Sequence, residues 1–99
     1  MNYNTEENIR KCLKRFNEIE NLQEGWDGYG GAVPEKIVCD NARTFFQTLR
    51  DTNCLIPHFD EIAPTPYGTI VIDVYSDEED KDLVSIEIGK TQVGFFTDY

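Results

Sequence analysis

Hydrophobic residues in the first half of the chain recur at steps of three and four positions, the spacing of an amphipathic helix. Residues 4–23 are therefore predicted to form a first helix. Asn4 or Thr5 can cap it, because the side-chain oxygen of either residue accepts a backbone N–H. The apolar stripe of this helix consists of Ile9, Cys12, Leu13, Phe16, Ile19 and Leu22.

A second helix is expected to begin at Pro34, a residue that suits a first helical turn, and to run to about Thr52. Its predicted buried side consists of Val38, Ala42, Phe45, Phe46 and Leu49, with Ile37 at the edge. The second half of the chain changes to a two-residue alternation, which is typical of strands with one buried face. The expected strands are a short edge strand around Phe59–Ala63, then Thr69–Tyr75, Leu83–Ile88 and Thr91–Thr97.

Two helices followed by a run of strands predict an α+β fold. We expect one domain, residues 1–99, with two N-terminal helices packed on one face of a three- to four-stranded antiparallel meander sheet. The strand positions assigned to the core are Ile70, Ile72, Val74, Val84, Ile86, Ile88, Val93 and Phe95. The opposite face carries Val71, Asp73, Tyr75, Ser85, Glu87 and Phe96, a mixture that fits either a plain solvent face or a contact surface for a partner.

The segment GWDGYGG, residues 25–31, lies between the two predicted helices and must reverse the chain. Its four glycines, at 25, 28, 30 and 31, suit a turn that needs positive φ and close backbone approach. We expect Trp26 to cover the open end of the core with its indole N–H on a loop carbonyl. Asp27 is expected to accept backbone N–H groups, and Tyr29 to face solvent. The same loop also fits a rigid aromatic surface presented to a partner.

Charge excludes several functions. The net charge is −10, and it is concentrated in residues 51–99, which hold eleven acidic and two basic residues. Such a surface repels duplex nucleic acid and anionic membranes, so direct binding to either is not expected. The acidic half either attracts a basic partner or only confers solubility.

The remaining composition indicates a cytoplasmic protein. No apolar run approaches the roughly 20 residues of a membrane span, and MNYNTEEN lacks the basic-then-apolar pattern of a signal peptide. Cys12, Cys39 and Cys54 are an odd number of cysteines without a CxxC motif, which favours reduced thiols used in packing.

Motifs for chemistry are sparse. His58 is the only histidine, so a zinc site is not expected, and Cys54 four residues before it is a weak candidate for a nucleophile pair. The acids of SDEEDKD lack the EF-hand pattern, and GYGG lacks the lysine and hydroxyl of a phosphate-binding loop. We therefore predict no cofactor, no metal and no catalytic set.

The motif LxxGWDGYGG, a proline that opens a helix, and the stretch APTPYGTIVIDV together resemble a family of small uncharacterised bacterial proteins. Those proteins carry a WDGYGA-type motif, a helix and a PTPDG-like turn that enters a strand. The resemblance covers roughly residues 18–90 and implies a bacterial or phage origin and a cytoplasmic location, without an established activity. Here Gly31 precedes the usual alanine, Tyr67 replaces the aspartate of the turn, and Asp73–Val74 replaces Glu–Trp.

The leading hypothesis is a non-catalytic, acidic module that binds another protein, and an antitoxin-like or defence-related accessory protein is one form of this hypothesis. Its predicted contact residues are Trp26, Tyr29, Tyr75 and Phe96, with Asp73 and Glu87 steering the approach. One alternative is a small hydrolase or transferase that uses His58 and nearby acids; another is an acidic mimic of nucleic acid. The last strand, Thr91–Thr97, is also a candidate for pairing with its copy in a homodimer.

Overall fold

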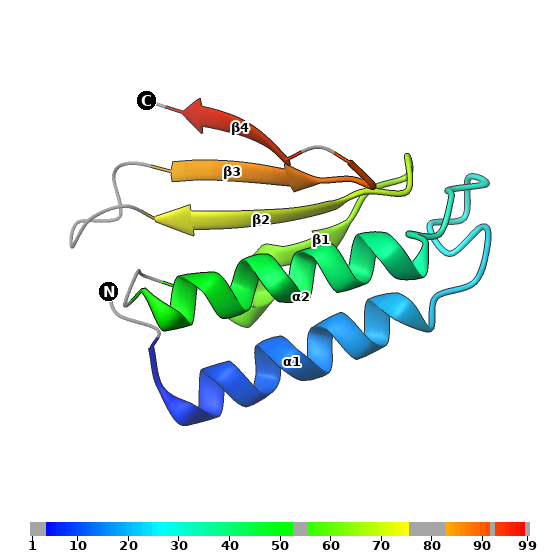
Figure 1. Ribbon diagram of the computed structural model, residues 1–99. Helices are drawn as coiled ribbons and strands as arrows, with labels where there is room; N and C mark the ends of the chain where they lie inside the picture. The colour runs from blue at the N-terminus through cyan, green and yellow to red at the C-terminus, as the bar shows by residue number, and fades with distance from the viewer. Residues whose placement is uncertain (1–3, 53–55, 76–82, 92, 99) are drawn as a thin grey trace.

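The computed structural model is an α+β fold in two layers, and it describes residues 4–52, 56–75, 83–91 and 93–98. Two helices lie side by side on one face of an antiparallel sheet (Figure 1), in which the four strands follow their order in the chain. This arrangement confirms the predicted fold class. The elements are α1 (Glu6–Glu20), α2 (Lys36–Asp51), the 3-10 helix η1 (Phe59–Glu61), β1 (Ile62–Pro64), β2 (Ile70–Tyr75), β3 (Leu83–Ile88) and β4 (Val93–Asp98).

The first helix is capped by Thr5, whose Oγ1 accepts the N–H of Asn8 at 3.1 Å. Asn4, the other candidate cap, instead accepts the N–H of Ile56 through its side-chain oxygen at 3.1 Å. Thr5 is therefore the N-cap of α1. Asn4, the residue before it, instead connects the start of the chain to Ile56, which follows α2.

The buried stripe of α1 differs from the predicted one at Leu13, which is 40% exposed, while Asn8 is buried. Each residue turns an α-helix by about 100°, so Leu13 lies about a quarter-turn beyond Cys12 and leaves the core-facing side. Asn8, one turn before Cys12, remains on that side. Including Leu13 in the stripe was therefore wrong.

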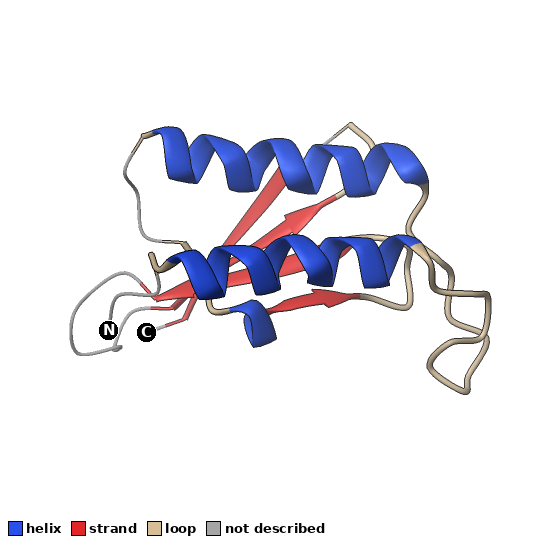
Figure 2. Cartoon of the chain, turned by 90° about the horizontal axis from the view of Figure 1, so that it is seen from below, coloured by secondary structure: helices blue, strands red, loops and turns tan. Residues whose placement is uncertain are grey.

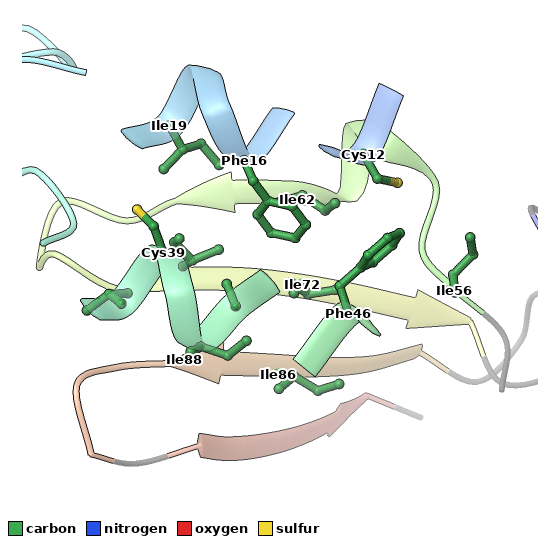
Figure 3. Close-up of a cluster of buried hydrophobic side chains, with 13 residues drawn as sticks. Cys12, Phe16, Ile19, Cys39, Phe46, Ile56, Ile62, Ile72, Ile86 and Ile88 are labelled. Carbon is green, nitrogen blue, oxygen red and sulfur yellow. The ribbon is translucent and has the colours of Figure 1, made fainter. Parts of the chain in front are cut away.

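The core lies between the two helices and the sheet (Figure 3), and the rings of Phe16 and Phe46 meet edge to face at its centre with centroids 5.6 Å apart. That geometry is favourable for aromatic pairs. The predicted inward face of β2 and β3 is confirmed at its buried isoleucines, and Val74 and Val84 pack beside them. The buried apolar side chains are Cys12, Phe16, Ile19, Val38, Cys39, Ala42, Phe46, Ile56, Ile62, Ile70, Ile72, Ile86 and Ile88.

The first strand begins later than predicted. Residues Phe59–Glu61 form a 3-10 turn, and only Ile62–Pro64 pair with β2. The side chain of His58 accepts the N–H of Asp60 at 3.3 Å, and its carbonyl accepts the N–H of Glu61 at 2.9 Å. These bonds close a turn, so extended structure starts only at Ile62. The last strand, at Val93–Asp98, also begins later than the predicted Thr91.

Candidate binding surface

The glycine segment forms a loop beyond the ends of both helices, drawn in cyan in Figure 1 and projecting from the helix layer in Figure 2. Gly25, Gly28 and Gly30 have φ of 77°, 81° and 77°. Residues with a Cβ rarely adopt this left-handed conformation, so three of the four glycines meet the predicted need for positive φ. Gly31 is required for a different reason, which lies in its neighbour Asp27.

The carboxylate of Asp27 holds the loop closed. Its Oδ1 accepts the backbone N–H of Tyr29 and that of Gly31, each at 2.9 Å, which confirms the predicted role. Hydrogen bonds from these two N–H groups favour the ionised form and hold the pKa of Asp27 below its ordinary value. A carboxylate in this position fixes the tip of the loop around the exposed Tyr29.

Trp26 is held by its own loop. Its indole N–H donates to the carbonyl of Ala32 at 3.0 Å, as predicted. Among the described residues, however, the partly buried side chains that pack on the core do not include Trp26. The ring is half-buried at the base of the loop, so the expectation that it covers the open end of the core is wrong. The hydrogen bond from its indole N–H to Ala32 instead holds the Trp26 ring against the loop.

A second turn, residues 65–68, lies against the glycine loop. The N–H of Ala32 donates to the carbonyl of Pro66 at 2.9 Å, and Ala32 forms a bridge with Tyr67. Tyr29 is 93% exposed and Tyr67 is 86% exposed. The fold thus joins two turns, each with an exposed tyrosine, and we call residues 25–32 and 65–68 together the loop end of the molecule. Tyr67 was not among the predicted contact residues.

A chain of hydrogen bonds leads from the loop end to the outer face of the sheet. The N–H of Tyr67 donates to Oγ1 of Thr65 at 3.2 Å, and the hydroxyls of Thr65 and Thr69 are 2.6 Å apart. Thr69 donates its single hydroxyl proton to Oε2 of Glu87 at 2.7 Å, so the proton between the two threonines comes from Thr65. Glu87, a predicted contact residue, is thereby held beside the Tyr67 turn.

Asp73 occupies the same outer face farther along β2. It lies opposite Ser85, whose hydroxyl donates to its Oδ1 at 2.6 Å. Both Asp73 and Glu87 are half-buried, and each accepts a hydroxyl proton, so their negative charges are kept in fixed positions. Such charge-assisted bonds are stronger than those between neutral groups.

Two predicted contact residues are placed only through their backbone. Phe96 lies opposite Ser85 in the register of β3 and β4, and Tyr75 lies two residues beyond Asp73 in β2. Their side chains lie outside the described part of the structure, as do Cys54 and the acidic stretch at 76–82. Among the predicted contact residues, Trp26 and Tyr29 therefore lie in the loop end and Glu87 lies next to it. Asp73 lies on the adjoining face of the sheet.

His58 lines a pocket near the N-terminal end of α1, at the opposite end of this helix from the glycine loop. An open pocket of about 200 Å³ is lined by Thr5, Glu7, Asn8, Lys11, His58 and Phe59. Lys11 pairs with Glu7 at 3.3 Å and lies over the ring of Phe59, with Nζ 4.9 Å from the centroid. Trp26 and Asp27 follow the opposite end of this helix and do not line the pocket.

Asn8 lies buried in the wall of this pocket and connects α1 to the chain before β1. This role was not predicted from the sequence. Its Nδ2 donates to the carbonyl of Pro57 at 2.9 Å, and its Oδ1 accepts the N–H of Phe59 at 3.0 Å. A buried amide that bonds at both ends can lie within a core at little cost. Asn8 therefore fixes the position of the pocket wall against the helix.

The sequence also raised the questions of a metal site, of a reactive cysteine and of a membrane span. Over those ranges, no group of three or more His, Cys, Asp or Glu side chains is arranged to hold a metal ion. Burial raises the pKa of the Cys12 thiol to about 12, which suppresses the thiolate that a nucleophile needs. Neither α1 nor α2 is long and apolar enough to cross a membrane.

Comparisons with models of protein families, with curated proteins and with solved structures find no match to this chain.

Proposed function

We propose that this protein is a non-catalytic, acidic module of the bacterial or phage cytoplasm that binds another protein through the loop end and the adjoining outer face of the sheet. The observation that carries the proposal is the pair of exposed tyrosines, Tyr29 and Tyr67, on two turns that are hydrogen-bonded to each other. An accessory role, antitoxin-like or defence-related, is consistent with a small protein of this kind.

Two features support binding at the loop end. Tyrosine is enriched among the residues that dominate binding energy, because its large ring has few torsions to freeze. The loop that carries Tyr29 is already fixed by the Asp27 carboxylate and by the bond between Trp26 and Ala32. A contact surface ordered before binding loses less conformational entropy when it meets a partner.

Charge indicates the kind of partner. The chain carries a net charge of −10, and Asp73 and Glu87 hold two of its carboxylates on the sheet face next to the loop end. A basic partner would be drawn to this surface and oriented by it, with an association rate that falls as salt is added. We therefore expect a basic protein and strongly salt-dependent association.

The experiment is capture of the partner from the native host by the tagged protein, with matched variants. Tyr29→Ala/Tyr67→Ala should lower the affinity for the captured protein by about a hundredfold, which corresponds to two contact residues that each contribute about 1.4 kcal/mol. The control Leu13→Ala/Ile37→Ala removes two exposed apolar side chains from the helices, at 40% and 51% exposure, and should leave binding unchanged. Equal recovery by the tyrosine variant and the control would contradict the proposal.

The predicted contacts at Tyr75 and Phe96 need their own variant. Tyr75→Ala/Phe96→Ala should also weaken binding if the contact surface continues from the loop end across the outer face. The homodimer through the last strand remains a prediction, which light scattering of the purified protein tests.

A second candidate is the small hydrolase or transferase that uses His58. It is favoured by two observations: the pocket that His58 lines also contains the acid Glu7, and Oδ2 of Asp60 lies 3.5 Å from Nδ1 of His58. Turnover of simple nitrophenyl esters or phosphates that is lost in His58→Gln and kept in Arg50→Gln would support it. A His58→Gln protein as active as the wild type would remove it.

A further inference from the structure

The two edges of the sheet are built differently. Edge strand β1 has three residues and ends in Pro64, which has no N–H to donate. The carbonyl of Ile62 in this strand accepts the Nε–H of Arg15 from α1 at 2.8 Å. A short strand, a proline and a helix laid along it are common ways in which proteins prevent pairing with another chain. The β1 edge is therefore closed.

The β4 edge lacks these features. β4 has six residues, pairs with β3 along its whole length and is the outermost strand of the sheet. Figure 1 shows it beyond the helix layer, whose main contacts with the sheet are with β1, β2 and β3. Its sequence, VGFFTD, contains no proline or lysine and has one charge, at its last residue. Over the described residues no further strand pairs with its outer side, and such an edge offers backbone donors and acceptors to an incoming strand.

The register of β3 and β4 indicates that this edge favours a positively charged side chain on an added strand. Glu87 of β3 lies opposite Gly94 of β4, and cross-strand partners share a face of the sheet. Because Gly94 has no side chain, nothing at that position blocks the path from Glu87 to a strand added beyond β4. In the unbound chain the Glu87 carboxylate is turned the other way, toward Thr69 on the β2 side of β3, so an incoming cation has to take the place of the Thr69 hydroxyl. The backbones of β3 and the added strand would be about 10 Å apart, twice the usual strand spacing, which a lysine or arginine and a glutamate turned toward it can together span.

We propose that the β4 edge accepts an extended basic segment of the partner protein as a fifth strand, with a lysine or arginine over Gly94 that faces Glu87. This inference rests on the proposed function and names the manner of docking. A second copy of the chain is the other occupant to consider. Two copies would bring together two net charges of −10 and two Glu87 carboxylates, which repel each other. The electrostatics therefore favour a different, basic chain.

The test uses the full-length protein and three synthetic nine-residue peptides. The first, TKVKVKVKT, alternates lysine with valine; the second has glutamate in place of lysine; the third keeps every lysine but has proline in place of its central valine, so that it cannot form a strand. The expected result is that only the first peptide slows hydrogen exchange of amides at 93–98, measured by NMR. A pairing strand protects alternate amides, because only every second N–H points to the new edge.

Matched variants separate the local contact from the net charge. Glu87→Gln keeps an acceptor for Thr69 and should weaken binding of the first peptide about fivefold to tenfold. Glu61→Gln makes the same change of charge at η1 and should change the affinity less than twofold. Gly94→Lys, which places a cation over Glu87, should abolish protection of β4 while the protein stays folded. Equal effects of Glu87→Gln and Glu61→Gln would overturn the inference.

Three other outcomes would also overturn it. Equal binding of the proline peptide would show attraction by charge alone. Protection of β4 without peptide, together with a dimer by light scattering, would assign the edge to a second copy. No protection of β4 by any peptide would show that the edge is not a docking site. If Gly94→Lys still captures the host partner while Tyr29→Ala/Tyr67→Ala does not, the edge inference fails and the proposed function stands.

Discussion

The carboxylate of Asp27 fills the space that a side chain at position 31 would need. A Cβ built on Gly31 would lie 2.7 Å from Oδ2 of Asp27, closer than real Cβ atoms approach other groups. The approach is close because Oδ1 of the same carboxylate accepts the N–H of Gly31 at 2.9 Å. Gly31 is therefore required by a hydrogen bond, whereas the other glycines of the loop are required by their backbone conformation.

Gly31→Ala should lower the free energy of unfolding by about 1–3 kcal/mol, the usual cost of forcing an extra methyl group into a filled space. Urea denaturation monitored by Trp26 fluorescence measures this change. In an Asp27→Ala background the clash is gone, so the same substitution should cost clearly less. Equal costs in the two backgrounds would contradict the steric explanation.

Gly30→Ala is the matched control for backbone strain. A Cβ at Gly30 would meet no atom within 4 Å, but the residue has φ of +77°. We expect a loss of about 1 kcal/mol from conformation alone. This loss arises without any contact to the Asp27 carboxylate, which distinguishes it from the effect of Gly31→Ala.

The stability of the protein should depend on the ionisation of Asp27. Because the pKa of Asp27 is lower in the folded chain, ionisation stabilises the fold at pH above its unfolded value of about 3.9. That contribution is lost as the pH falls through the lower, folded pKa. The difference in unfolding free energy between wild type and Asp27→Asn should therefore be constant above about pH 5 and change progressively as the pH falls below about 4. A difference that is the same from pH 7 to pH 2 would contradict this role.

Asn8→Ala should destabilise the protein by about 2–4 kcal/mol, because it takes the amide partner from two backbone groups, one buried and one part-buried, and the buried carbonyl keeps only the weak Sγ–H donor of Cys12 at 3.6 Å. Those groups are the carbonyl of Pro57 and the N–H of Phe59. The control Asn21→Ala, at the exposed end of the same helix, should cost less than about 1 kcal/mol. Thermal unfolding followed by circular dichroism compares the three proteins. A small effect of Asn8→Ala would show that these two hydrogen bonds contribute little to stability.

Cys12 and Cys39 should resist alkylation in the folded protein. At pH 8 a thiol with a pKa of about 12 holds roughly a thousandfold less thiolate than an ordinary cysteine, and Cys12 is fully buried. Burial and the nearby Glu20 also raise the pKa of Cys39. Mass spectrometry after iodoacetamide treatment, with and without urea, should find both sites labelled only in urea. Labelling of Cys12 in native buffer at the rate seen in urea would contradict its burial.

Local patterns predicted most of the fold, because the periodicity of apolar positions reports which side of an element faces the core. The buried isoleucines of β2 and β3 follow the alternation, and Phe16 and Phe46 follow the helical spacing. The errors lie where a position is next to a stripe or at an element end. Leu13 is apolar like the core residues, but its angular position around the helix turns it away from the core. Residues Phe59–Glu61 form a turn because His58 accepts hydrogen bonds from their backbone.

The candidate site was less accessible to sequence reasoning. The roles of Asp27 and of the Trp26 indole N–H could be predicted, because both act within a few residues along the chain. Tyr67 was missed because its neighbour Ala32 is far away in sequence and nothing in the local pattern connects the two turns. An aromatic residue that follows two prolines and precedes a glycine was the signal available, since such a residue lies at the tip of a turn that is normally exposed.

By itself, the sequence determined the two helices, the inward faces of β2 and β3, and the internal bonding of the glycine loop, since each depends on residues close along the chain. The tertiary structure decided that Asn8 is buried against Pro57 and Phe59, that the Tyr67 turn joins the loop of Tyr29, and that Glu87 is bound to that turn through Thr69. These relationships arise from hydrogen bonds between distant segments, which form only after the helices have packed on the sheet and which leave no periodic trace in the sequence.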